Sequence, residues 1–147
     1  MDKNTKKQID IINQRIKELN SVYHVAALQS GISDGELSIW SVMLNSDEQY
    51  SQQDLCELLS LSKQTVNSIV SNLIKKGFVI LEHVPGTRNR KVICLTKEGG
   101  IYGRDKVMWI FEAEQKALEQ TDPEQVKVCI EMMEKYIRLL KNELNLD

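Results

Sequence analysis

Apolar residues near the two ends of the chain recur every three or four positions. The N-terminal series is Ile9, Ile12, Ile16, Leu19, Tyr23 and Ala26, and the C-terminal series is Val126, Ile130, Met133, Ile137, Leu140 and Leu144. This spacing averages about 3.5 residues, the period of a helix that packs lengthwise against another helix. It predicts one helix from about residue 6 to residue 29. It predicts another from Asp122-Pro123, where Asp caps and Pro takes the first helical position, to about residue 144.

These two terminal helices are expected to pack together. An apolar stripe of nearly three heptads on a terminal helix exceeds what a small domain can cover, so we expect a homodimer. Its interface would be formed by the first four residues of the N-terminal series and by all six residues of the C-terminal series.

Two short helices are predicted between Gly31, which ends the first helix, and Ser62. Ser33-Asp34-Gly35-Glu36 has the pattern of a capping box and starts a helix from about residue 34 to residue 45. Ser51 and Asp54 repeat the pattern more weakly and start a third helix. The residues expected to be buried on these two helices are Leu37, Trp40, Val42 and Leu44, then Leu55, Leu58 and Leu59. Gln49 and Tyr50 could add a short strand beside the hairpin described next.

The stretch from Ser62 to Thr96 predicts a helix followed by a β-hairpin. Ser62 can cap the helix, a buried stripe follows at three- and four-residue spacing, and Gly77 can take the left-handed stop. The stripe is Val66, Ile69, Val70 and Leu73. Residues 78–84 form an apolar run of strand length, residues 85–89 (Pro-Gly-Thr-Arg-Asn) a turn, and residues 90–95 a returning strand. The third helix and this one, joined by a tight connection, make a helix-turn-helix.

The exposed face of the Ser62 helix has the composition of a DNA-contacting surface. Between Ser60 and Ile80 there is no acidic residue, whereas an ordinary solvated face mixes Glu with Lys. From Lys63 to Lys91 the chain carries six basic residues and one acid, Glu82. A polar helix can read a major groove while a basic hairpin reaches the neighbouring minor groove. The residues predicted to contact double-stranded DNA are Ser62, Lys63, Gln64, Thr65, Asn67, Ser68, Arg88, Arg90 and Lys91.

After the hairpin, Thr96 can cap a helix that runs to about Glu119, although Gly99 and Gly100 weaken its first turns. The predicted fold is therefore mainly α with a small β-hairpin wing, in a single domain over residues 1–147. Residues 1–30 and 121–147 are the dimerisation helices, residues 33–96 the winged helix-turn-helix core, and residues 97–119 the connecting helix.

Charge and composition narrow the function. The chain has 147 residues with net charge −2, 41% hydrophobic and 27% charged residues, which indicates a globular protein. Residues 51–100 carry a net charge of +3 and the rest is acidic, so phosphate contact is localised to that third. With no secretory signal, no membrane-length apolar run and three scattered cysteines, the sequence predicts a cytoplasmic protein that is not bound to a membrane.

No enzyme signature is present, so no catalytic residue, metal site or cofactor is predicted. The two histidines, His24 and His83, are too few for a histidine-based metal cluster, and no glycine-rich phosphate loop occurs. Cys56 and Cys94 are interpreted as small core residues, with redox sensing as the alternative. A ligand pocket is a further possibility, against the alternative that its residues are plain core: Tyr23, His24, Trp40, Met43, Met108 and Trp109.

Two stretches resemble the MarR family of transcriptional regulators. Residues 61–79 (LSKQTVNSIVSNLIKKGFV) are similar to that family's recognition helix, and residues 85–99 (PGTRNRKVICLTKEG) resemble its wing and the joint that follows. The resemblance implies an obligate dimer with interleaved terminal helices, a pseudo-palindromic operator, often repression, and often release by a small aromatic ligand. The sequence departs from the family at Thr87-Arg88-Asn89, where the family usually has Asp-Arg-Arg. The peroxide-sensing N-terminal cysteine and the zinc sites of two subgroups have no counterpart.

A winged helix can have two functions other than DNA binding. A winged helix can serve as a protein–protein interaction module, although such a module does not need a basic, acid-free helix face. A winged helix can also serve as the dimerisation domain of a methyltransferase, but 147 residues leave no room for a catalytic half. DNA binding is therefore the favoured interpretation.

Overall fold

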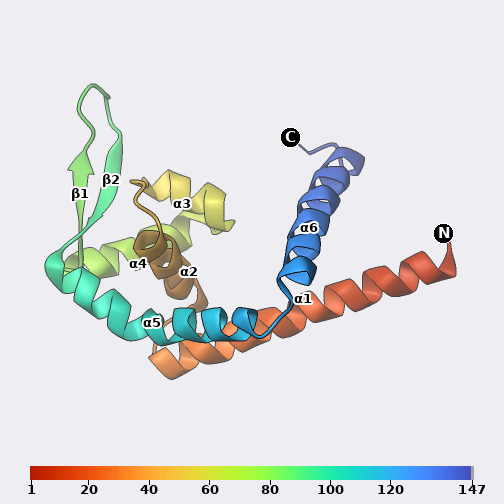
Figure 1. Cartoon of the computed structure of the whole chain (residues 1–147). Helices are drawn as coiled ribbons and strands as arrows, with labels where there is room; N and C mark the ends of the chain where they lie inside the picture. The colour runs from red at the N-terminus through yellow and green to blue at the C-terminus, as the bar shows by residue number, and fades with distance from the viewer. Residues whose placement is uncertain (147) are drawn as a thin grey trace. The chain divides into compact units, whose positions relative to one another are not determined.

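The structure is a computed structural model that describes residues 1–146, and it has the predicted order of helices and strands (Figure 1). The elements are α1 (Lys3–Ser30), α2 (Asp34–Asn45), α3 (Gln52–Leu59), α4 (Lys63–Lys75), β1 (Val79–His83), β2 (Lys91–Leu95), α5 (Lys97–Glu119) and α6 (Pro123–Glu143). The protein is thus mainly α with a two-stranded antiparallel hairpin, as predicted. It divides into two compact units, residues 1–108 and residues 109 onward, so the boundary falls within α5.

The core of the first unit is built around α2 and α4. Trp40, Leu55, Leu73 and Val107 are fully buried there, and Val79 joins them from β1. The remaining large side chains that are almost completely buried are Ile39, Val66 and Val70.

Burial on the two short helices differs from the prediction at several positions. Ile39 is completely buried although the sequence pattern passed over it, and Val42 and Leu44 are only half-buried. Because α2 packs against α1, α3 and α4, side chains on more than one side of the helix are buried, and a single apolar stripe does not describe its buried surface. On α3, Leu58 is 56% exposed because Leu55 and Leu59, four residues apart, already form the inward line.

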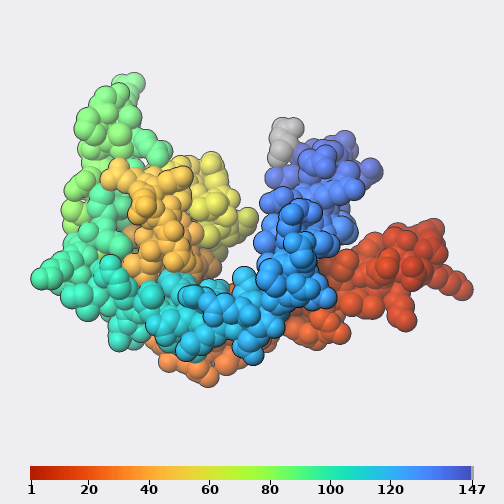
Figure 2. Space-filling view, viewed as in Figure 1, coloured from red at the N-terminus to blue at the C-terminus, as the bar shows by residue number. Residues whose placement is uncertain are grey.

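The hairpin follows directly from the end of α4. Gly77 has φ +78°, and the Phe78 N–H donates to the Leu73 carbonyl at 2.9 Å, which is the left-handed stop that was predicted. Val79 then pairs with Leu95 and His83 with Lys91. Figure 2 shows the tip of this hairpin projecting from the body of the first unit.

Residues 49 and 50 do not form a strand, which corrects one expectation. Their contribution to the sheet is one backbone hydrogen bond, from the Ile93 N–H to the Tyr50 carbonyl at 2.8 Å. A single bond does not make a ladder, so the sheet described in residues 1–146 keeps two strands.

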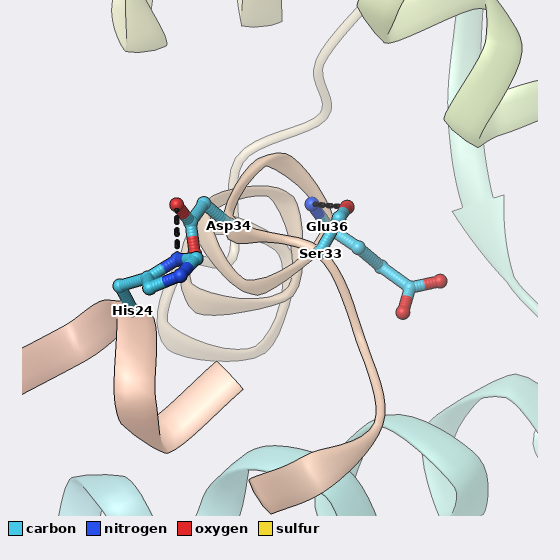
Figure 3. A network of polar contacts seen from close by, with 4 residues as sticks. All are labelled: His24, Ser33, Asp34 and Glu36. Atoms are coloured by element: carbon cyan, nitrogen blue, oxygen red, sulfur yellow. Dashed lines mark hydrogen bonds and ion pairs between the residues drawn. The ribbon is translucent and has the colours of Figure 1, made fainter. Parts of the chain in front are cut away.

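The capping box that the sequence indicated more strongly, at α2, is incomplete, whereas the weaker one, at α3, is complete. The Ser33 hydroxyl accepts from the Glu36 N–H at 3.1 Å, but the Glu36 carboxylate extends away from Ser33 (Figure 3). At α3 both halves are made: the Ser51 hydroxyl accepts from the Asp54 N–H and the Asp54 carboxylate accepts from the Ser51 N–H at 2.9 Å. The shorter Asp54 side chain therefore completes the reciprocal pair of capping hydrogen bonds. Glu36 takes no part in capping α2 and is a largely buried residue.

The joint between α4, the hairpin and α5 is compact. The Thr96 hydroxyl accepts from the Gly99 N–H at 3.0 Å, so Thr96 caps α5 as expected, and it donates to the Gly77 carbonyl at 2.6 Å. A Cβ at residue 99 would lie 1.8 Å from the Phe78 carbonyl oxygen. Gly99 is therefore required by the close approach of two backbone segments, although glycine disfavours a helix.

Candidate nucleic-acid interface

The polar face of α4 is exposed along its whole length. Val66, Val70 and Leu73 point inward and are at most 1% exposed, which fixes the rotation of the helix. The side chains on the opposite face are all exposed: Lys63, Gln64, Thr65, Asn67, Ser68, Ser71 and Asn72. An uncharged-to-cationic surface with this many donors and acceptors can form hydrogen bonds to base edges and phosphates.

Ser62 has a local role at the start of this helix. Its hydroxyl accepts from the Thr65 N–H at 3.1 Å and donates to the Thr65 hydroxyl at 2.8 Å. The cap thereby orders the first turn of α4, where the predicted contact residues Lys63 and Gln64 lie. Ser62 remains exposed, so its predicted contact with DNA stays a prediction.

The hairpin tip presents Arg88 to solvent. The Val84 N–H donates to the Arg90 carbonyl at 2.8 Å and the Thr87 hydroxyl donates to the Val84 carbonyl at 2.7 Å. Gly86 supplies the left-handed residue of the turn with φ +79°. The exposed Arg88 side chain therefore lies on a tip whose backbone is hydrogen-bonded to itself.

Arg90 is held against α3. Its Nη2 lies 2.7 Å from the Asp54 Oδ2, so the carboxylate that closes the α3 capping box also binds the hairpin where its turn meets β2. This ion pair joins the start of α3 to the hairpin. The Arg90 hydrogen bond, together with the Ser51 N–H, lowers the pKa of Asp54 from its ordinary value. The geometry thus favours a positioning role for Arg90.

The effect of removing the Arg90–Asp54 ion pair on the pKa of Asp54 and on stability should be measurable in the absence of DNA or any other ligand. In Arg90→Met the pKa of Asp54 is expected to rise toward its ordinary value, because the guanidinium that stabilises the charged form is gone. The free energy of unfolding should fall by no more than about 1 kcal/mol, since the pair is partly exposed. A lowered folded-state pKa contributes stability above the ordinary pKa of Asp and loses it at lower pH, so this difference should be present at pH 7 and shrink in acid.

Carboxyl NMR titration and urea unfolding at several pH values test this expectation. Lys91→Met, which removes a neighbouring exposed cation from β2, is the control and should leave the Asp54 titration in place. An Asp54 titration that is the same in Arg90→Met and in the unaltered protein would contradict the assignment of this ion pair.

Sequence reasoning missed the polar residues of α3 beside the hairpin. A cleft of about 440 Å³ brings Gln52 and Gln53 together with Asn89, Arg90 and Lys91. The signal was present, because Ser51 marks the start of α3 and the first N–H groups of a helix favour anions. The position of the hairpin next to that end is a long-range feature that the sequence pattern does not carry.

The six residues proposed for a ligand pocket have different environments. Trp40 is fully buried, its ring centroid lies 5.8 Å from that of Tyr102, and within residues 1–146 its Nε1 has no hydrogen-bond partner. Met43 lines a cleft of about 230 Å³ with Tyr50 and Ile93. Trp40 is thus a core residue, and a pocket that includes it stays a prediction.

The other four candidates differ in exposure. His24 is exposed and its Nδ1 lies 2.9 Å from the Asp34 carboxylate, as Figure 3 shows. Tyr23 is half-buried, whereas Met108 and Trp109 are 38% and 42% exposed. None of these four side chains lines the two clefts described above, so a common ligand site for them stays a prediction.

The predicted interface residues are uncovered in the single chain. On α1, Ile12, Ile16 and Leu19 are 40–55% exposed, and Ile9 is half-buried. On α6, Val126 is half-buried, and the exposed members of the stripe are Ile130, Met133, Ile137, Leu140 and Leu144. An exposed apolar surface of this extent normally marks an interaction site.

Other chemistry is sparse in the described residues. Cys56 and Cys94 are half-buried, and burial, followed by the neighbouring Glu82, raises the pKa of the Cys94 thiol. Cys129 is exposed. Residues 1–146 contain no group of three or more His, Cys, Asp or Glu side chains that could hold a metal ion. In the same range no helix is both long and apolar enough to cross a membrane.

Comparison with known proteins identifies the fold. A sequence model of the MarR family matches residues 30–88, which include α2, α3, α4 and β1. No curated protein sequence matches the chain. The fold is similar to a MarR family regulator from Neisseria meningitidis, with a TM-score of 0.79 and 17% identity over 94% of this chain and 96% of that one.

Two further solved structures extend the comparison. Staphylococcus aureus MepR in its DNA-binding conformation aligns with a TM-score of 0.74 and 18% identity, over 90% of this chain and 98% of that one. CouR from Rhodococcus jostii RHA1, bound to p-coumaroyl-CoA, aligns with a TM-score of 0.69 and 18% identity, over 87% of this chain and 90% of that one. These similarities cover the terminal helices as well as the winged helix, so the fold extends over nearly the whole chain.

Proposed function

We propose that this chain, whose residues 30–88 match a sequence model of the MarR family, binds double-stranded DNA in a sequence-specific way and regulates transcription. The observation that carries the proposal is the exposed face of α4, which is acid-free and lies beside a hairpin with basic residues. The competing function, a protein–protein interaction module, does not require that composition.

We assign base contacts to three residues of α4. Gln64 and Asn67 can each pair through two hydrogen bonds with an adenine, and Lys63 can donate to a guanine edge in the major groove. Ser62, Thr65 and Ser68 would contact phosphates or sugars and set the register of the helix. All six side chains are exposed, which supports the assignment.

The hairpin is proposed to contact the adjacent minor groove. Arg88 is exposed at the tip and would enter the groove, most favourably where A·T tracts narrow it. Lys91 would bind a phosphate. Arg90, already paired with Asp54, would hold the hairpin at the correct angle to α3 rather than reach the bases.

A homodimer would place two such surfaces on one operator. The apolar stripes of α1 and α6 are uncovered and support association of two copies. The two recognition helices must lie about 34 Å apart to enter successive major grooves of a pseudo-palindromic site. Repression by occupying a promoter, in the cytoplasm, is the expected mode.

Release of DNA by a small ligand is part of the same proposal. CouR has been solved with p-coumaroyl-CoA, and Staphylococcus aureus MarR with salicylate and kanamycin. A ligand that fixes a spacing of the α4 helices other than about one helical turn of DNA would weaken binding, because the half-sites could not both be engaged. A small aromatic compound near Met43 is the candidate occupant for this chain.

The test begins by selecting genomic fragments that the dimer retains and measuring their affinity at several salt concentrations. In Arg88→Ala the affinity should fall, and the salt slope should decrease by about one unit per protomer, because one phosphate-region contact per protomer is lost. Lys116→Ala removes an exposed cation from the last turn of α5, outside the proposed interface, and serves as the matched control.

Two outcomes would count against the proposal. If no genomic fragment is retained above the level of random DNA, the protein–protein module becomes the better interpretation. If fragments are retained but Arg88→Ala behaves like Lys116→Ala in affinity and slope, the hairpin is not a DNA contact.

A further inference from the structure

A histidine connects the first strand of the hairpin to the second half of its turn. The first half is held by Thr87, whose N–H and hydroxyl both donate to the Val84 carbonyl, at 3.3 and 2.7 Å. In the second half, at the projecting tip in Figure 2, the His83 Nε2 lies 3.3 Å from the carbonyl oxygen of Arg88. Within residues 1–146 this is the described hydrogen bond that reaches residues 88 and 89. His83 thus contacts the backbone of the arginine that is proposed to enter the minor groove.

The hydrogen bond fixes where the protons of the His83 ring lie. A carbonyl oxygen only accepts, so Nε2 must carry a proton and donate it to the Arg88 carbonyl. A second proton would bind at Nδ1 of this exposed side chain and make the ring an imidazolium. The Nε2 donor is the same in both forms. Protonation would therefore add a positive charge to the tip and leave the hydrogen bond to the turn in place.

The charged residues of the hairpin that border His83 are cations. Lys91 is its partner in the hairpin register, so the two side chains lie on the same face of the sheet. Arg88, which accepts the hydrogen bond through its backbone, carries its guanidinium on the same exposed tip. An imidazolium at residue 83 would enlarge this group of positive charges, and the phosphates of a duplex would be its favourable partners.

The acids of the neighbouring elements are engaged elsewhere. The Glu82 carboxylate contacts a thiol on the opposite face of the hairpin, because successive side chains of a strand alternate between faces. On α3, Asp54 binds Arg90, and Glu57 accepts a hydrogen bond from its own helix. Within residues 1–146 no ion pair therefore joins a carboxylate to His83.

We propose that His83 positions the second half of the turn and, when protonated, contacts a DNA phosphate beside the minor groove, so that operator binding strengthens as the pH falls. This inference rests on the proposed function and adds a residue and a form of regulation to it. Histidine is the side chain whose charge ordinarily changes between pH 5 and pH 8. Because linkage between two ligands is reciprocal, DNA that binds the protonated form better also promotes proton uptake by the ring.

The experiment measures how tightly the full chain binds a retained genomic fragment at pH 6 and at pH 8, by fluorescence anisotropy at several salt concentrations. We expect the dissociation constant to be about fivefold lower at pH 6, because a dimer gains two exposed charge contacts. The salt slope should be steeper at pH 6 by up to about one unit per protomer, since each protomer contributes one more cation. A purely structural role of His83 would not change the salt slope.

Two variants separate the charge from the hydrogen bond. His83→Gln keeps an N–H donor but cannot become charged, so it should bind like the unaltered protein at pH 8 and gain nothing at pH 6. His83→Phe keeps a ring without a donor and should bind about threefold more weakly at pH 8, because the turn loses its hydrogen bond. The matched control is His24→Gln, which removes the other histidine of the chain, on α1 beside Asp34, and should retain the full pH effect.

Nitrogen-15 NMR tests the ring without and with DNA. In the free chain at pH 8, His83 should carry its proton on Nε2, because the Arg88 carbonyl must receive it. Addition of the fragment at pH 7 should increase the imidazolium fraction of His83 and leave that of His24 unchanged. The His24→Gln variant assigns the two sets of signals.

The proposal is overturned if His83→Gln shows the same pH effect as the unaltered chain, or if affinity does not change with pH. It is also overturned if His83→Phe binds at pH 8 like the unaltered chain, or if the free His83 ring carries its proton mainly on Nδ1. In each of these cases a genomic fragment is still retained, so the proposed function stands. Failure of the proposed function differs, because no fragment is then retained above random DNA at either pH, and this inference falls with it.

Discussion

Ile137→Asp should convert a dimer into monomers and abolish operator binding. Ile137 is 51% exposed at the centre of the apolar stripe of α6, where the proposed partner would bury it. Placing a carboxylate in an apolar contact, once per protomer, is expected to weaken association by at least about 3 kcal/mol, or more than 100-fold in the dimer dissociation constant. Sedimentation velocity over a concentration series measures this change, and fluorescence anisotropy with an operator fragment measures the consequence.

Asn142→Asp introduces the same acid on the polar side of α6 and is the matched control, with little change in association expected. A monomeric Ile137→Asp variant that still bound a two-half-site operator with unchanged affinity would contradict the requirement for two recognition helices. An Ile137→Asp variant that remained dimeric would remove α6 from the interface.

Gly99→Ala should destabilise the fold more than the addition of a methyl group at any other glycine. The added Cβ would lie 1.8 Å from the Phe78 carbonyl oxygen, so the backbone of α5 or of the α4–β1 connection must move. We expect a loss of about 3 kcal/mol or more in the free energy of unfolding, near the upper end for overpacking, because the obstacle is backbone. Urea unfolding at a fixed protein concentration tests it.

The neighbouring glycine is a sharp control. A Cβ at residue 100 would approach the Arg104 guanidinium to 3.0 Å, and that flexible end can turn aside. Gly100→Ala should therefore leave stability unchanged or raise it by up to about 1 kcal/mol, because alanine favours a helix. Equal effects of the two substitutions would show that helix propensity, rather than the contact with Phe78, governs this turn.

Features that depend on neighbouring residues were predictable from the sequence. The caps Ser33, Ser51, Ser62 and Asp122 and the stop at Gly77 act over two to five residues, and the structure confirms them. The exposed face of α4 follows from its inward stripe in the same way. The fold class and most element boundaries rest on such local signals.

Features that depend on distant residues were not predictable. Asp54 and Arg90 are 36 positions apart, and nothing in the sequence pairs a helix-capping carboxylate with the turn of the hairpin. The burial of Glu36, the exposure of Leu58 and the absence of a strand at Tyr50 likewise depend on how elements pack. The pattern that suggested a ligand pocket around Trp40 could not distinguish a core ring from a cavity wall.

The bond from the Thr96 hydroxyl to the Gly77 carbonyl has a consequence for how this protein could change its target. It joins the residue before the hairpin to the residue after it, so the two ends of the 18-residue segment between them are held together by a hydrogen bond. Insertions, deletions or exchanges at the tip would then leave the helices on either side in place. The hairpin could thus be replaced by one of another length or sequence while the rest of the molecule folds as before, and under the proposed function such a replacement should alter the preference for minor-groove sequences.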